Sequence, residues 1–245
     1  MADEEVIRLS KRMSELGLCS RREADQLIEA GKVLVDGSVV SKLGSRVHRG
    51  QEITLTKSGQ ADLDGKKTIL INKPVGYVSA QAEPGYTPAI RLITAANQSP
   101  SDQPKEIPQN LKSFAPAGRL DIDSKGLLIL TQDGLFAAEV IKPDSDIEKE
   151  YHVRTDRPLT DKELERLHQP IQMDDRTLKP VKVLRRGEAA FTFLLKEGRK
   201  RQIRRMIEIV GAEVVFLKRV RIGKIKLAGL REGHWRYLKP GESLN

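Results

Sequence analysis

Two stretches near the N-terminus carry apolar residues at helical spacing, and short β-rich runs follow them. The stretches 7–17 and 20–31 each end at a glycine, and the second begins with Ser20 and Glu23 in the pattern of a capping box. The runs on either side of Asp36-Gly37 predict a hairpin, because this dipeptide readily adopts the positive φ angles of a tight turn. Residues 1–60 therefore predict a compact module of two helices and a small sheet.

After residue 60 the pattern changes to many strands with a few helices between them. Residues 61–67 are polar and contain a glycine, which favours a linker. Continuous apolar runs such as GLLILT predict buried strands, and helices are predicted over 133–141, 160–168 and 198–211. Strands and helices do not alternate strictly. The pattern thus predicts an α+β protein whose larger domain, 68–245, has a mixed, largely antiparallel sheet flanked by helices.

Residues 95–113 interrupt this pattern with three prolines and few apolar residues. Such a composition predicts a flexible surface loop. The loop leads into the stretch 117–134, AGRLDIDSKGLLILTQDG, so we expect it to border any site that this stretch forms.

The charge of the chain is concentrated near its C-terminus. The net charge is +9 over 245 residues, and residues 196–245 alone hold 14 Lys/Arg against 5 Asp/Glu. Residues 1–60 are nearly balanced, with 10 Lys/Arg against 9 Asp/Glu. A basic block of this size predicts a polyanionic partner, and nucleic acid is the first candidate.

The cysteine content, the N-terminal residues and the lengths of the apolar runs exclude several classes of protein. A single cysteine, Cys19, excludes an internal disulfide, and the charged N-terminus lacks a signal-peptide pattern, so we expect a cytoplasmic protein. No apolar run approaches the ~18 residues of a membrane span, so no membrane association is expected. The histidines and the cysteine show no metal-ligand spacing, which predicts no metal site. The pattern contains no seam for oligomerisation, and a monomer is expected.

The helix predicted over 198–211 has arginines on different faces. Its apolar stripe consists of Ile203, Met206, Ile207 and Val210. On a helical wheel Arg201 and Arg205 lie opposite this stripe, so they are expected to face solvent or phosphate. Arg204 lies at the border of the stripe, where its stem can cover the core while its guanidinium enters a cleft and holds a carboxylate. A plain surface arginine is the alternative for Arg204.

Four basic residues of the N-terminal module are candidate phosphate contacts. Arg21 and Arg22 stand at the start of the second predicted helix, where backbone amides and basic side chains together favour an anion. Lys11 and Arg12 on the first helix can add to the same site. A small capping domain without RNA contact is the alternative, since the module carries little net charge.

The stretch 117–134 places three aspartates beside an arginine and a buried strand. Its GRLDIDSKGLLILTQDG sequence closely resembles the signature of the ribosomal RNA pseudouridine synthases of the RsuA type. Further motifs of this family match INKPVGYVS at 71–79, KEY at 149–151 and GRKRQIRRM at 198–206. Residues 9–37 are similar to the S4-type RNA-binding module that precedes the catalytic domain in one branch. The resemblance covers almost the whole chain in order, and loop 95–113 is its least family-like part.

The resemblance implies the isomerisation of uridine to pseudouridine in RNA, without a cofactor or metal. The C1′–N1 glycosidic bond breaks, the uracil turns, and C5 joins C1′. By its place in the motif Asp121 is the expected catalytic residue. A carboxylate suits a reaction that builds positive charge on the sugar, whether it acts as a nucleophile or as a base toward a sugar proton. The resemblance places Arg204 beside Asp121, where a cation favours the ionised carboxylate.

The resemblance also implies roles for residues around the catalytic aspartate. Tyr151 is expected to stack on the flipped uracil, Leu227 to pack near the base, and Arg119 to orient the RNA or the loop. A residue of the strand core without contact to the base is the alternative for Tyr151. Of the other two aspartates, Asp123 is expected to shape the loop with Ser124, and Asp133 to serve as a turn or helix-cap residue.

The target RNA is the least determined part of this interpretation. The KEYHV segment and the 198–206 helix look most like the large-subunit synthases of the F type, which predicts 23S ribosomal RNA as the substrate, with a tRNA uridine as a further candidate. A 16S ribosomal RNA target is the alternative. A non-catalytic, ribosome-associated RNA-binding factor would not need Asp121, Tyr151 and Arg204 together, and all three are present. A base-releasing glycosylase would share the carboxylate chemistry but not the whole-chain resemblance.

Overall fold

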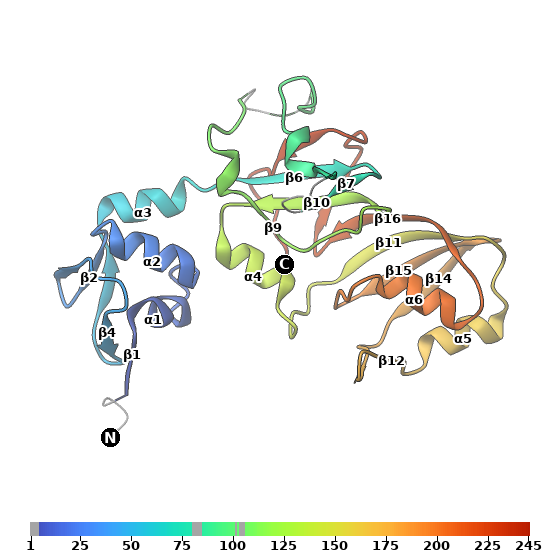
Figure 1. Ribbon diagram of the computed structural model, residues 1–245, viewed down its shortest axis with the longest axis horizontal. Helices are drawn as coiled ribbons and strands as arrows, with labels where there is room; N and C mark the ends of the chain where they lie inside the picture. The colour runs from blue at the N-terminus through green and yellow to red at the C-terminus, as the bar shows by residue number, and fades with distance from the viewer. Residues whose placement is uncertain (1–4, 80–84, 101, 103–105) are drawn as a thin grey trace. The chain divides into compact units, whose positions relative to one another are not determined.

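The chain divides into two compact units in the computed structural model (Figure 1), which describes residues 5–79, 85–100, 102 and 106–245. Unit 1 comprises Met1–Lys67 with Thr131–Ala138, and unit 2 comprises Thr68–Leu130 with Glu139–Asn245. The expected α+β class is confirmed. None of the helices in the described ranges is long and apolar enough to cross a membrane.

Unit 1 has the two helices and small sheets that its sequence predicts. Its elements are β1 (Val6–Arg8), α1 (Leu9–Glu15), α2 (Arg21–Glu29), β2 (Val33–Val35), β3 (Ser38–Val40), β4 (Arg46–His48), β5 (Ile53–Leu55) and α3 (Lys57–Asp64). The capping box of Ser20 and Glu23 opens α2, and Asp36 and Gly37 both have positive φ in the β2–β3 turn. Buried apolar side chains of α1, α2 and β2 form its core.

The segment predicted as a linker, 61–67, is partly helical, because α3 covers its first half. The Thr56 hydroxyl accepts a hydrogen bond from the Gly59 amide at 3.1 Å and so caps this helix. Lys32 forms an ion pair with Asp62 on α3. These two contacts stabilise a polar helix that has little apolar periodicity to predict it.

Most strands of unit 2 belong to one large mixed sheet. Among the described residues its order is β14-β15-β11-β16-β10-β6-β18, with β17 beside β16 and β9 beside β10. Their bounds are β6 (Thr68–Lys73), β9 (Ala115–Pro116), β10 (Lys125–Thr131), β11 (Lys149–Thr155), β14 (Lys182–Gly187), β15 (Ala190–Leu195), β16 (Val214–Ile222), β17 (Ile225–Lys226) and β18 (Trp235–Tyr237). Antiparallel pairs predominate, but β10 and β16 run parallel.

The remaining elements are shorter, and one of them, α4, spans the boundary between the two units. They are β7 (Tyr77–Val78), β8 (Thr87–Pro88), the 3₁₀ turns η1 (Ala89–Leu92) and η2 (Leu111–Ser113), α4 (Gly134–Ile141), α5 (Asp161–His168), β12 (Gln172–Met173), β13 (Arg176–Thr177) and α6 (Gln202–Ile209). In Figure 1, α5 and α6 lie beside β14 and β15. The apolar stripe of α6 is buried there, as the helical wheel predicts.

Two hydrophobic clusters lie along the sheet. One joins α5 and α6 to β11, β14 and β15, and the other gathers around β6, β10, η1 and Trp235. Tyr151 on β11 packs against both clusters. The parallel pair between β10 and β16 meets at Gly126, where a Cβ would lie 2.2 Å from the Arg219 carbonyl oxygen. A glycine is therefore required at this point of the sheet.

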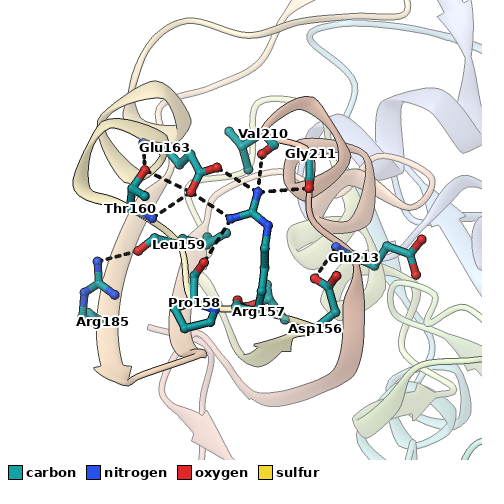
Figure 2. A network of polar contacts seen from close by, with 11 residues as sticks. Asp156, Arg157, Pro158, Leu159, Thr160, Glu163, Arg185, Val210, Gly211 and Glu213 are labelled. Atoms are coloured by element: carbon teal, nitrogen blue, oxygen red, sulfur yellow. Dashed lines mark hydrogen bonds and ion pairs between the residues drawn. The ribbon is translucent and has the colours of Figure 1, made fainter.

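A polar network holds α5 and α6 in place (Figure 2). The Arg157 guanidinium, just after β11, donates to Glu163 at the start of α5 and to the carbonyls of Val210 and Gly211 at the end of α6. Glu163 also completes the predicted capping box with Thr160. One arginine thus ties the beginning of α5 to the end of the helix that carries Arg204.

Most described residues of loop 95–113 are exposed, as expected of a surface loop, but its first part is anchored to the sheet. Gln98 and Asp102 are buried, and the Asp102 carboxylate accepts hydrogen bonds from the Gln98 side chain and the Tyr237 amide. The indole of Trp235 donates to the Thr94 carbonyl at 2.8 Å. Composition could not reveal these partners, because they lie on β18, far away in the sequence. Residues 101 and 103–105 lie outside the described residues.

Candidate active site

Asp121 lies in a tight turn between β9 and β10. The Ser124 amide donates to the Asp121 carbonyl at 3.1 Å and closes the turn. The Asp121 side chain is half-buried, so it can meet a ligand and remain solvated. The turn delivers the chain into β10, whose apolar side chains from Leu127 to Leu130 are buried. A buried strand therefore fixes one end of the loop that presents the carboxylate.

The INKPVGYVS segment braces the same turn. The Ser79 hydroxyl donates to the Leu120 carbonyl at 2.7 Å and accepts from the Leu120 amide at 2.8 Å. The Gly76 amide donates to the Ile122 carbonyl at 2.9 Å. These bonds hold the residues on both sides of Asp121. The sequence showed that the two motifs occur in one chain, but not that Ser79 joins them.

Lys73 is a buried cation near Asp121 that sequence reasoning missed. Its side chain is fully buried at the end of β6, and its ammonium donates to the Pro74 and Tyr77 carbonyls at 2.9 and 2.8 Å. Burial lowers the pKa of Lys73 to about 8, while the negative charges of Asp121 and Asp123 oppose this shift. The one sign of this site in the sequence was a lysine at the end of a strand whose other residues are mostly apolar.

Arg204 pairs with Asp123, not with Asp121 as the resemblance implied. Its Nε lies 3.2 Å from Asp123 Oδ2, and its Nη2 donates to the Asp123 carbonyl at 3.0 Å. Its Nη1 donates to the Val214 carbonyl. Asp121 and Asp123 are two residues apart, but the turn points their carboxylates in different directions. A sequence motif cannot show which of the two meets the arginine. Asp123 does shape the loop as expected, but through arginines more than through Ser124, whose hydroxyl is 3.5 Å from its carboxylate.

Arg201 and Arg205, the two arginines predicted to face solvent or phosphate, also have carboxylate partners. Arg201 lies outside α6, as its N-cap, with a left-handed φ of 55°, so the predicted helix starts four residues late. Its Nη1 lies 2.9 Å from Asp123 Oδ2. Arg205 makes two hydrogen bonds of 2.9 Å to Asp174 in the β12–β13 turn. Both guanidinium groups remain partly exposed, so either can still meet a phosphate.

The remaining predicted residues of the larger domain lie at different depths. Tyr151 is half-buried on β11, with Phe193 and Arg219 as its cross-strand neighbours. Leu227 is buried just after β17. The Arg119 side chain is exposed, and its carbonyl accepts a hydrogen bond from Arg219 at 3.2 Å.

The predicted phosphate contacts of unit 1 differ in how free they are. Arg21 and Arg22 are exposed in the first turn of α2, and the ion pairs of the described residues do not include them. Lys11 lies 3.6 Å from Glu15. Arg12 is half-buried and donates to the Arg49 carbonyl. Arg21 and Arg22 are therefore the better placed of the four to meet RNA.

The site offers carboxylate and cation chemistry. Asp121 supplies a carboxylate on a braced turn, and Lys73 supplies positive charge nearby. Arg201 and Arg204 hold the neighbouring Asp123. Within the described ranges no three His, Cys, Asp or Glu residues form a group that could hold a metal. Such a site can oppose positive charge on a substrate and place a carboxylate against an electrophilic carbon.

Comparison with known proteins identifies the family. Residues 67–208 match the RNA pseudouridylate synthase family, and residues 7–53 match the S4 domain. The dual-specificity RNA pseudouridine synthase RluF of Salmonella typhi is 34% identical over 247 residues, which cover 100% of this chain and 80% of the relative. The ribosomal large subunit pseudouridine synthase B of Bacillus subtilis (strain 168) is 36% identical over 250 residues, covering 96% and 93%.

The three-dimensional structure agrees with this assignment. A crystal structure of a pseudouridylate synthase superimposes with a TM-score of 0.64 at 26% identity and covers 95% of this chain and 96% of its own. The family match spans more than half of the chain and the relatives span all or nearly all of it. The protein therefore belongs to the RNA pseudouridylate synthases, isomerases that act on RNA, and carries an S4 domain at its N-terminus.

Proposed function

We propose that this enzyme isomerises a specific uridine of 23S ribosomal RNA to pseudouridine. The relatives that span nearly the whole chain include a synthase named for the large ribosomal subunit, which supports this target. Another relative is named a dual-specificity RNA pseudouridine synthase, so a tRNA uridine is a further candidate. The uridine must leave its stack to reach a half-buried carboxylate, which costs least in a loop.

In this proposal Asp121 is the catalytic residue. The observation that carries it is the bracing of its turn, since Ser79 bonds both the amide and the carbonyl of Leu120. A carboxylate fixed in this way can meet C1′ as the glycosidic bond breaks and positive charge builds on the ribose. Arg204 and Arg201 act through Asp123, because they hold the turn that presents Asp121.

The roles of the other residues follow from their positions. Tyr151 stacks on the flipped uracil from β11, and Leu227 packs beside the base. Arg119, with its exposed side chain, orients the RNA. We assign residues 1–60 to RNA binding, 61–67 to a linker and 68–245 to catalysis. The basic residues Lys11, Arg12, Arg21, Arg22, Arg201 and Arg205 contact phosphates in this scheme. The protein acts as a monomer in the cytoplasm.

Mapping pseudouridines tests reaction and target together. Ribosomal and transfer RNA are isolated from cells with and without the gene, and every pseudouridine is located by chemical probing and sequencing. One position in 23S RNA should lose its pseudouridine in the deletion strain and regain it when the purified protein is added. A lost position in 16S RNA would overturn the large-subunit target. Unchanged RNA with inactive protein would overturn the proposed function.

A further inference from the structure

Three cations are buried in unit 2 without a carboxylate partner. The exposed fractions of Lys73, Lys149 and Arg219 are 0%, 7% and 3%. Across the described ranges no carboxylate lies within ion-pairing distance of any of them. The positive charge of Arg219 contributes to lowering the pKa values of both lysines. Burying like charges together is costly unless an anion joins them.

Two of these cations stand beside Tyr151 on one face of the sheet. Lys149 precedes Tyr151 by two residues on β11, and both positions pair regularly with β15, so their side chains share a face. Arg219 on β16 pairs with Tyr151, next to a β-bulge that shifts the register between Glu150 and Tyr151. Directly opposed residues have Cβ atoms about 5 Å apart. Both cations therefore extend from positions next to Tyr151 in the sheet, the residue that is expected to stack on uracil.

Both cations have donors to spare. Arg219 uses Nε on the Leu127 carbonyl at 2.8 Å and Nη1 on the Arg119 carbonyl at 3.2 Å. Its Nη2 is buried and has no partner among the residues described. Burial, with the charges of Arg219 and Lys179, lowers the pKa of Lys149 to about 8. Its ammonium makes no hydrogen bond to the described residues, and it is not one of the fully buried polar atoms, so it keeps access to solvent or a ligand. The unused Nη2 of Arg219, in a buried place, indicates a missing acceptor.

We propose that Lys149 and Arg219 bind a carbonyl oxygen of the uracil ring and stabilise the negative charge that the ring acquires during the reaction. This inference rests on the proposed function. When the C1′–N1 bond breaks, its electron pair leaves with the base and spreads onto the ring oxygens, while Asp121 meets the positive charge left on the ribose. When C5 then bonds to C1′, C5 loses its proton and N1 gains one, so no oxidant or further reactant is needed.

The position of the cations favours the base over a backbone phosphate. A phosphate keeps its charge throughout the reaction, so a site for it strengthens binding equally in the ground and transition states. A site for the departing base gains strength only as the bond breaks, in the manner of an oxyanion hole. The two alternatives therefore differ in their kinetics when one cation is removed. Loss of a phosphate site weakens RNA binding, whereas loss of a site for the departing base slows the chemical step.

The test variant is Lys149→Met, because this side chain holds no loop in place. Its substrate is a transcript of the stem-loop around the mapped uridine, containing either uridine or 5-fluorouridine at that position. We expect the single-turnover rate on uridine to fall about 10²-fold while the dissociation constant changes less than about twofold. Lys149→Arg should recover most of the rate. Lys179→Met, the same change at a neighbouring cation, is the control and should retain the wild-type rate.

The fluorinated substrate separates charge stabilisation from a structural role. Fluorine stabilises the departing anion, so the consumption of 5-fluorouridine should slow only about 10-fold in Lys149→Met. Arg219→Lys keeps the positive charge but loses the planar guanidinium with its several donors. It should also slow the reaction of uridine more than that of 5-fluorouridine. Equal losses on both substrates, or weaker binding with an unchanged rate, would overturn the inference. A wild-type protein that consumes neither substrate would instead overturn the proposed function.

Discussion

Arg204 and Asp123 form an ion pair in the turn that presents Asp121, with Nε and Oδ2 3.2 Å apart. Arg204 is mostly buried, at 11% side-chain exposure, whereas Asp123 is 39% exposed. The arginine thus anchors the turn through a carboxylate that is not the proposed catalytic one. Asp121 is left free of a direct arginine partner within the described structure, with the buried Lys73 as a nearby source of positive charge.

Replacing Asp121 by Asn should abolish pseudouridine formation. The substitution keeps the size of the side chain but removes the charge, so activity should fall at least about 10³-fold with little change in folding or RNA affinity. Asp133→Asn is the matched control, because Asp133 accepts hydrogen bonds from the Leu135 and Phe136 amides at the start of α4. Activity is measured on the mapped RNA. A fully active Asp121→Asn variant would refute the assignment.

The Arg204–Asp123 pair should behave as one unit. Asp123→Asn and Arg204→Lys should each lower kcat about 10-fold, because the turn that presents Asp121 loses an anchor. The double variant should lose little more than either single one. In urea denaturation the coupling should be only about 0.5–1 kcal/mol, since Asp123 is partly exposed. Fully additive losses in kcat would show that the two residues act separately.

Ser79→Ala should lower the stability of the protein and its catalytic rate. The change leaves a buried amide and a buried carbonyl of Leu120 without their partner, which costs about 1–3 kcal/mol in the free energy of unfolding. Ser45→Ala removes one exposed hydrogen bond to the Lys42 carbonyl and is the control, with an expected cost below about 0.5 kcal/mol. Denaturation curves and kcat measure both effects. Equal stability of the two variants would contradict the bracing role.

Lys149 should make stability increase with pH above neutrality. Its pKa is lowered from 10.5 to about 8 in the folded protein, so between these values the unfolded chain binds more protons. The unfolding free energy should therefore rise by about 1–2 kcal/mol from pH 7.5 to 9.5 relative to Lys149→Met. Lys182→Met, at an exposed position, is the control. Parallel pH curves for wild type and Lys149→Met would exclude a lowered pKa.

Reversing the charges of Arg21 and Arg22 should weaken RNA binding. With both changed to Glu, the affinity should fall about 10-fold at moderate salt. The slope of log affinity against log salt concentration should also become less steep, by the amount expected for the loss of about two phosphate contacts. Lys42→Glu with Lys57→Glu makes the same charge change at exposed positions elsewhere in unit 1. Filter binding at several salt concentrations measures both. Equal effects of the two pairs would point to net charge rather than a specific phosphate site.

Local sequence patterns predicted the local structure of this protein well. The capping boxes at Ser20 and Thr160 and the Asp36-Gly37 turn form as expected, because each depends on residues within four positions of one another. The partners of Arg204, Asp102 and Ser79 could not be predicted in this way, since they lie far away in the sequence or differ from a near neighbour only in direction. Lys73 was hidden because burial is invisible in composition.

Tyr151 contacts both hydrophobic clusters of unit 2. A ring in this position supports two cores at once, so a smaller residue would leave a cavity in each. Under its proposed role the same ring also selects a flat base. Evolution therefore cannot retune the base preference of this enzyme through Tyr151 without loosening the domain.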